Sequence, residues 1–189
     1  NQQQRHKTNA RHARHDLRWK KKNHGNLHAS IFEMSKLSVV ATPIGNLEDI
    51  TLRALRVLKE ADFVACEDTR VTKKLLSHYD IHTRAVTLSN VQKLLEQGKH
   101  VALVSDAGTP GVSDPGLEIV SHAREYFRGH QVSTVDTRCP QIEAIPGPSA
   151  LAAAISVAGL RAPTFVFYGF LPQKKGREKL FKDMASQTR

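Results

Sequence analysis

The alternation of short apolar runs with amphipathic stretches, beginning at residue 37, is the feature that most constrains the fold. The stretches between the runs carry apolar residues at helical spacing, as in the stripe from Ala54 to Ala61. This alternation is typical of βα units wound into a mostly parallel sheet. Strands are predicted at residues 37–41, 63–66, 84–88, 100–105 and 143–145, and helices at 47–61, 69–79, 91–97, 116–127 and 149–160.

The predicted fold class is α/β, with a five-stranded, mostly parallel sheet flanked by helices in residues 36–160. A β-prone run at 164–169 and a basic helix at 176–184 follow. Because one strand and one helix cannot close a core, these pieces either pack on the preceding domain or begin a second one. We interpret residues 161–189 as the start of an incomplete C-terminal α/β domain.

The N-terminal segment is strongly basic. Residues 1–28 carry eight Lys or Arg and one acid, which supplies most of the formal net charge of +10. A segment so poor in apolar residues cannot offset its ordering entropy, so residues 1–35 are predicted to be a disordered tail. Three interpretations stay open: an arm that seeks nucleic-acid phosphates, sequence translated from upstream of a start at Met34, or an organellar transit peptide.

Cysteine use and hydropathy exclude several classes of protein. Cys66 and Cys139 stand 73 positions apart without ligand spacing around them, so we expect no disulfide and no metal site, and a reducing, cytoplasmic compartment. The longest near-apolar stretch, residues 150–160, is about half of the roughly 20 residues that a bilayer span needs, so no membrane association is expected.

Three loops rich in Gly and Pro follow predicted strands, at residues 42–46 (TPIGN), 106–116 (DAGTPGVSDPG) and 146–150 (PGPSA). In a parallel sheet, ligands bind at the carboxyl ends of the strands, where backbone donors are free. Glycine lets a ligand approach the backbone, and proline fixes the geometry of that approach. Three such loops at one sheet edge favour a ligand site over ordinary turns.

Missing motifs narrow the chemistry. The chain has no GxGxxG after its first strand, no GxxxxGK[ST], no GxSxG and no HExxH. Standard dinucleotide-binding enzymes, P-loop hydrolases, serine hydrolases and zinc hydrolases therefore lack their characteristic parts.

The segments VATPIGNLEDITLRAL, ACEDTR, LVSDAGTPGVSDPG, PGPSALAAAISVAGL and FYGFLP resemble the ribosomal RNA small-subunit methyltransferase I family of the tetrapyrrole methylase superfamily. The resemblance covers about residues 37–92, 98–124 and 143–178. It implies an S-adenosylmethionine-dependent enzyme that methylates the ribose 2′-oxygen of a cytidine in small-subunit rRNA. It also implies two α/β domains with the cofactor between them, and a homodimer.

The resemblance places cofactor contacts on all three loops. They fall on Ile44, Gly45, Ala107, Gly108, Thr109, Val112, Ser149 and Ala150. Asp106 is a further candidate, because its carboxylate can balance a sulfonium charge or accept a hydrogen bond. For Asp106 and Asp114, turn or helix capping is an equally good interpretation.

Methyl transfer to a hydroxyl needs alignment of the oxygen and an acceptor for its proton. Glu67 and Asp68 are the candidate catalytic residues, and Arg70 is a candidate phosphate contact; a surface salt bridge or a helix-terminal charge is the competing interpretation. Lys174, Lys175 and Arg177 are candidate RNA-binding residues, against a plain solvated helix start.

Two other functions remain open from the sequence. One is a tetrapyrrole or protein side-chain methylase of the same superfamily, and the other is a noncatalytic RNA-binding remnant. The chain departs from the family pattern at two places. Only Ser89 and Asn90 separate Leu88 from Val91, where the family usually carries a longer polar segment associated with the substrate side. An additional stretch at residues 126–141 replaces a short turn between a helix and a strand.

Overall fold

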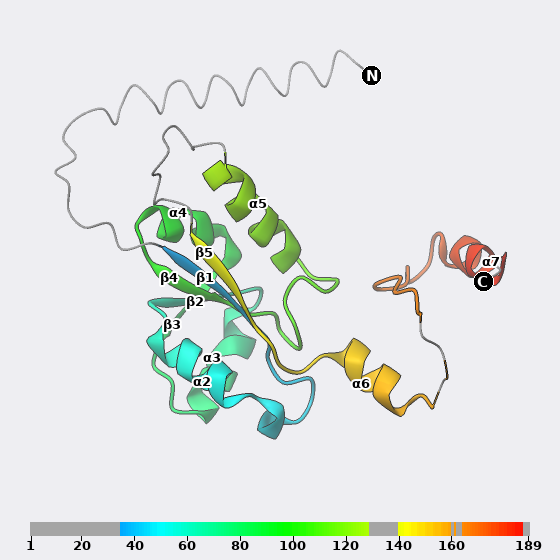
Figure 1. The fold of residues 1–189 in the computed structure, drawn as a ribbon, viewed down its shortest axis with the longest axis horizontal. Helices are drawn as coiled ribbons and strands as arrows, with labels where there is room; N and C mark the ends of the chain where they lie inside the picture. The colour runs from blue at the N-terminus through cyan, green and yellow to red at the C-terminus, as the bar shows by residue number, and fades with distance from the viewer. Residues whose placement is uncertain (1–34, 129–139, 160, 162–163, 187–189) are drawn as a thin grey trace, which may run out of the picture. The chain divides into compact units, whose positions relative to one another are not determined.

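The computed structural model describes residues 35–128, 140–159, 161 and 164–186. Five strands form one sheet in the order β3-β2-β4-β1-β5, and every neighbouring pair is parallel (Figure 1). They are β1 (Lys36–Val40), β2 (Phe63–Cys66), β3 (Arg84–Thr87), β4 (His100–Leu103) and β5 (Gln141–Ile145). The predicted fold class is confirmed. The predicted tail, apart from residue 35, and most of the additional stretch lie outside the described residues.

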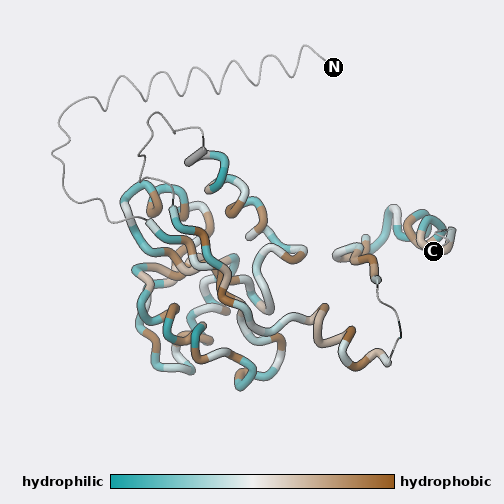
Figure 2. The backbone as a smooth tube through the Cα atoms, viewed as in Figure 1, coloured by the Kyte–Doolittle hydropathy of each residue, from teal (hydrophilic) through white to brown (hydrophobic). Residues whose placement is uncertain are grey.

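Helices cover both faces of the sheet (Figure 1). On one face, α2 (Leu52–Glu60) and α3 (Thr69–His78) pack Leu58 and Leu76 against strand residues such as Val64. On the other face, α4 (Val91–Glu96) and α5 (Gly116–Arg128) pack Leu95 and Ala123 against strand residues that include Leu103. The strands are therefore apolar on both sides, as Figure 2 shows for their course through the molecule.

The helix predicted over 47–61 is divided in two. A short 3₁₀ helix, η1 (Leu47–Asp49), is followed by extended backbone at Ile50, and α2 begins after Thr51. The Thr51 hydroxyl accepts a hydrogen bond of 3.0 Å from the Ala54 amide, which caps α2. Because a capping residue has extended backbone, Thr51 separates two helices that the apolar pattern alone had merged.

A polar group interrupts one face of the sheet. Ser38 is completely buried, and its hydroxyl lies 2.9 Å from both His100 Nε2 and Glu143 Oε1. Lys36 and Arg53 complete the group with ion pairs to Glu143 of 2.6 Å and 3.2 Å. β5 begins at Gln141, two residues before the predicted start, because its backbone pairing with β1 extends to Lys36, and the apolar pattern does not record that pairing.

The last described segment differs from expectation. Residues 164–169, predicted as a strand, form no strand, whereas α6 (Ala150–Val157) and α7 (Arg177–Ser186) agree with the predicted helices. A β-prone run forms a strand only by pairing, and none of the five described strands pairs with it. The domain boundary near residue 160 stays a prediction.

Candidate functional site

Hydrogen bonds join the three Gly- and Pro-rich loops at the carboxyl edge of the sheet. Thr42, after β1, and Gly108, after β4, exchange two backbone hydrogen bonds: the Thr42 amide donates at 2.9 Å and the Gly108 amide at 3.0 Å. The Thr109 hydroxyl donates a bond of 3.1 Å to the Pro148 carbonyl in the loop after β5. Loops far apart in the sequence therefore form one structure, which we call the loop cluster: residues 42–46, 106–116 and 146–150.

Gly108 lies at the centre of the loop cluster and accepts no larger residue easily. Its φ is +81°, and a Cβ there would lie 3.3 Å from Ile44 Cγ2 and 3.9 Å from the Pro148 carbonyl oxygen. The missing side chain thus lets all three loops meet at one position. Ile44 is 37% exposed, which leaves part of its apolar side chain for a ligand.

Thr42 is a structural residue of the loop cluster that sequence reasoning missed. It is 2% exposed, and its hydroxyl lies within hydrogen-bond distance of the Ser105 carbonyl, 3.3 Å, and the Gly108 carbonyl, 3.4 Å. The Ser105 hydroxyl also reaches the Ala107 and Gly108 carbonyls, each at 3.3 Å. The sequence did offer a signal for this role, because Thr42 and Ser105 are hydroxyl residues that each follow an apolar strand, β1 and β4.

Asp114 orders the second loop from within. Its carboxylate accepts hydrogen bonds from the Gly111 amide at 2.9 and 3.0 Å and from the Gly116 amide at 2.7 Å. The capping interpretation of Asp114 is therefore confirmed. The neighbouring Val112 and Ala107 are exposed on the same loop, as the cofactor interpretation requires of a contact residue.

Ser149 and Ala150 stand where the third loop enters α6. The Ser149 side chain is the N-cap and accepts a hydrogen bond of 3.4 Å from the Ala152 amide. Ala150 and Gly45 are exposed on their loops. The Ser149 hydroxyl already has this local structural role.

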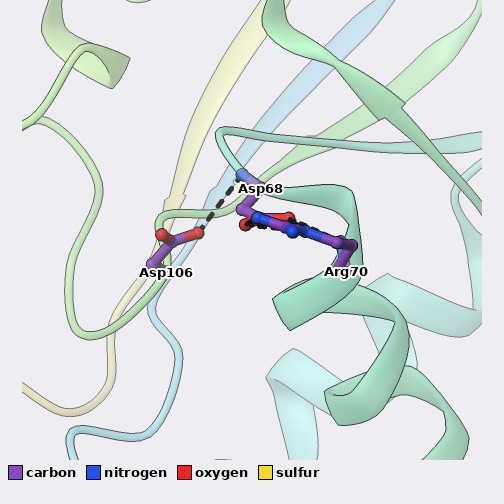
Figure 3. Close-up of polar contacts among 3 residues, drawn as sticks. All are labelled: Asp68, Arg70 and Asp106. Atoms are coloured by element: carbon purple, nitrogen blue, oxygen red, sulfur yellow. Dashed lines mark hydrogen bonds and ion pairs between the residues drawn. The ribbon is translucent and has the colours of Figure 1, made fainter.

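The two candidate carboxylates after β2 differ in their surroundings (Figure 3). Asp68 caps α3 and pairs with Arg70, whose NH2 donates at 2.7 Å to Oδ2, while the Arg70 amide donates at 2.8 Å to Oδ1. These bonds lower the pKa of Asp68 to about 2. The competing interpretation, a salt bridge at a helix terminus, thus describes Asp68 and Arg70 in this structure.

Glu67 is exposed and makes no hydrogen bond or ion pair with another described residue. Partial burial, followed by the negative charges of Asp106 and Asp114, raises the pKa of this carboxyl above its ordinary value. A carboxylate with a raised pKa is a better proton acceptor than an ordinary one. Of the two candidates, Glu67 is therefore better placed to take up a proton.

Asp106, the first residue of the second loop, connects the loop cluster with the loop after β2. Its Oδ1 accepts a hydrogen bond of 3.3 Å from the Asp68 amide (Figure 3). This bond connects the cofactor candidates on the second loop with Glu67 and Asp68. Turn capping, one option for Asp106, requires a donor in its own loop, whereas the donor found is the Asp68 amide in the loop after β2.

The remaining candidates lie near the start of α7. Lys174, Lys175 and Arg177 are exposed, and the Arg177 guanidinium lies 5.5 Å from the centre of the Phe181 ring.

Cys66 is buried and forms no disulfide, and Cys139 lies outside the described residues. Among the described residues, no three His, Cys, Asp or Glu side chains gather as a metal site would require. None of the helices in this part of the chain has the length and apolarity to cross a bilayer.

Comparison with known proteins identifies the class of this fold and site. Residues 36–188 match the family model described as Tetrapyrrole (Corrin/Porphyrin) Methylases, so the chain belongs to the tetrapyrrole methylase family. The family expected from the motifs is confirmed.

Within this family, the curated relatives are proteins named ribosomal RNA small subunit methyltransferase I. That of Thermotoga maritima is 41% identical over 166 residues, 82% of this chain and 69% of the relative. That of Leptospira biflexa is 48% identical over 158 residues, 77% of this chain and 61% of the relative. The chain spans between 47% and 69% of the length of such relatives.

Among solved structures, uroporphyrin-III-C-methyltransferase from Thermus thermophilus superimposes with a TM-score of 0.47 at 26% identity. The superposition covers 66% of this chain and 52% of that chain. The sheet order and the family match carry the fold assignment independently of it.

Proposed function

We propose that this chain forms the loop cluster of an S-adenosylmethionine-dependent methyltransferase that modifies the ribose 2′-hydroxyl of a cytidine in small-subunit rRNA. The observation that carries the proposal is the joining of three ligand-type loops through Thr42, Gly108 and Thr109. Curated relatives at 40–48% identity are named ribosomal RNA small subunit methyltransferase I, which supports rRNA as the substrate.

The residues of the loop cluster fit such a cofactor. S-adenosylmethionine carries an amino acid group, a ribose and a sulfonium, and when bound it supplies the methyl group. Small residues at positions 107 and 150 are exposed and leave backbone groups accessible for the amino acid group, whereas the amide and carbonyl of Gly108 are engaged with Thr42 and hold the loops together. The half-exposed Ile44 side chain offers an apolar wall, and the Asp106 carboxylate offers a negative charge for the sulfonium.

On the substrate side, Glu67 has the role of proton acceptor. As a 2′-oxygen forms its bond to carbon, its proton must leave, and the Glu67 carboxylate takes it up. Asp68 acts differently: its ion pair holds Arg70 at the start of α3, where the guanidinium can face a phosphate of the substrate. Asp68 is thus a positioning residue in this mechanism.

Primer extension on unmethylated small ribosomal subunits tests the function. Incubation with the chain and S-adenosylmethionine is expected to create one new pause, at a cytidine. The E67Q variant should lower the methylation rate about a hundredfold or more and leave cofactor affinity unchanged. E118Q, which changes an exposed carboxylate on α5, is the control. No pause with the unsubstituted chain would contradict the proposal, and methylation of a tetrapyrrole or protein instead would establish the alternative substrate.

The compartment and assembly belong to the same proposal. An enzyme that acts on small-subunit rRNA works in the cytoplasm of bacteria such as those that hold the relatives. We propose a homodimer, supported by the exposed apolar residues of α6, among them Ile155 and Val157 at 45% and 84% exposure. Size-exclusion chromatography with multi-angle light scattering measures the mass of the protein in solution. The mass of a monomer at micromolar concentration would contradict the homodimer.

A further inference from the structure

Positive charge is distributed unequally between the two helical layers of the sheet. The helices of one layer, α2 and α3, carry six Lys or Arg and a single acid, Glu60. The helices of the other layer, α4 and α5, carry three basic and three acidic residues. Figure 1 shows the two layers on opposite sides of the sheet, and the two core clusters agree. The helices of one layer are therefore strongly basic, and those of the other are balanced.

Within the basic layer, α3 has the most consistent charge. It contains no acidic residue, and Arg70, Lys73 and Lys74 are all exposed. They span little more than one helical turn, so Lys74 stands about 6 Å from Arg70 along the axis. Lys73 and Lys74 form no ion pair with a described residue. Two unneutralised ammonium groups thus project from the helix into solvent.

This basic face begins at the candidate site. Asp68, the residue that caps α3, donates its amide to Asp106 of the loop cluster. Positions 73 and 74 follow within two turns of that cap. A polyanion that lies along α3 therefore leads toward the carboxyl edge, where Glu67 stands.

We propose that the exposed face of α3, with Lys73 and Lys74 at its centre, holds the phosphate backbone of the RNA substrate beside the methyl-transfer site. The inference rests on the proposed function and adds a surface to it. RNA is the occupant that fits, because its phosphates repeat at short intervals and each can meet one lysine of the row. The contact positions the strand, while its bases are recognised elsewhere.

Charge neutralisation on the two layers provides the test. The K73Q/K74Q variant removes both charges, and glutamine has nearly the helix propensity of lysine, so α3 should remain folded. The matched control, K93Q/R124Q, removes two exposed charges from α4 and α5. Every variant keeps the same basic residues 1–28, so their contribution to RNA binding is common to all. Binding of a small-subunit rRNA transcript is measured by filter retention from 50 to 300 mM KCl.

We expect K73Q/K74Q to weaken RNA binding about tenfold, with a salt dependence shallower by about 1.4, the value for two phosphates of a single strand. K73R/K74R keeps both charges and should bind RNA with the affinity and the salt dependence of the unsubstituted chain. The affinity for S-adenosylmethionine should not change in any variant. Unchanged RNA binding in K73Q/K74Q, or an equal loss in K93Q/R124Q, would overturn the surface while leaving the proposed function intact. An unsubstituted chain that binds the cofactor and no RNA would overturn the rRNA substrate together with the surface.

Discussion

The backbone amide of Asp68 donates a hydrogen bond to the carboxylate of Asp106, and this bond joins the loops that follow β2 and β4. These strands are neighbours in the sheet. From β2 the chain continues to β3, at one edge of the sheet, and from β4 it continues to β5, at the opposite edge. The connections that follow β2 and β4 therefore run in opposite directions. Ligands of open parallel sheets bind at such a point. The bond therefore joins two loops at the point of the sheet where a ligand is expected.

The charge of Asp106 should contribute to the raised pKa of Glu67. Burial is the first cause of the raised pKa of Glu67, and Asp106 is the second. In D106N the pKa of Glu67 should fall toward its ordinary value of 4.5 without reaching it, because burial remains. Carbon-detected NMR titration of the side-chain carboxyl measures this, with E118Q as the control. An unchanged pKa in D106N would show that Asp106 does not act on Glu67.

Replacing Gly108 should disturb the loop cluster more than the same change elsewhere. In G108A, a positive φ costs about 1–2 kcal/mol, and the new methyl group also contacts Ile44. Gly176 has a similar φ of +87° but nothing within 4 Å of its Cβ position, so G176A is a matched control. Urea denaturation and cofactor titration are the measurements. Only G108A should lose cofactor affinity, and equal behaviour of the two variants would contradict the convergence of the loops at Gly108.

Asp114 should order the second loop. D114A leaves the Gly111 and Gly116 amides without their acceptor, which should lower the free energy of unfolding by about 1–3 kcal/mol. D114N keeps one oxygen acceptor and should lose less. Amide hydrogen exchange at both glycines is the direct readout. Slow exchange retained in D114A would mean that other bonds hold the loop.

His100 should make stability depend on pH. Burial, followed by the charge of Lys36, lowers the pKa of His100 below 6.5 in the folded chain. As the pH falls through 6.5, the unfolded chain takes up a proton that the folded chain does not, so the free energy of unfolding decreases. Glu143, whose pKa is lowered mainly by its hydrogen bond to Lys36, contributes in the same direction only below about 4.5.

Urea denaturation between pH 7.5 and 5.5 isolates the effect of His100. H100Q, whose amide can still donate to Ser38, should flatten the pH dependence in that range. A slope that persists in H100Q would assign it to another group.

Much of the fold followed from local pattern. The strands at 63–66 and 84–88 and the helix at 69–79 differ from the structure by at most one residue at either end, because apolar spacing records which side of each element is buried. The errors arose where polar contacts decide. Thr51 divides a predicted helix by capping, and Glu143 is paired in the sheet with charges that only the fold brings together.

The candidate site was predictable in outline only. Parallel strands bring their carboxyl ends to one edge, so the meeting of the loops around Gly108 could be expected. The division of labour between Glu67 and Asp68 could not, because it depends on where Arg70 and Asp106 lie in space. The same is true of Thr42, whose partners stand more than 60 residues away along the chain.

Amide chemical-shift mapping of the isotope-labelled chain during titration with S-adenosylmethionine tests the central claim most directly. We expect saturable shifts that cluster at Ile44, Gly108, Thr109 and Ser149. The amides of Ser38 and His100, which lie in β1 and β4 away from the loop cluster, should not shift. No shift in the loop cluster at millimolar cofactor, or shifts confined to the surroundings of Ser38 and His100, would contradict the proposed site.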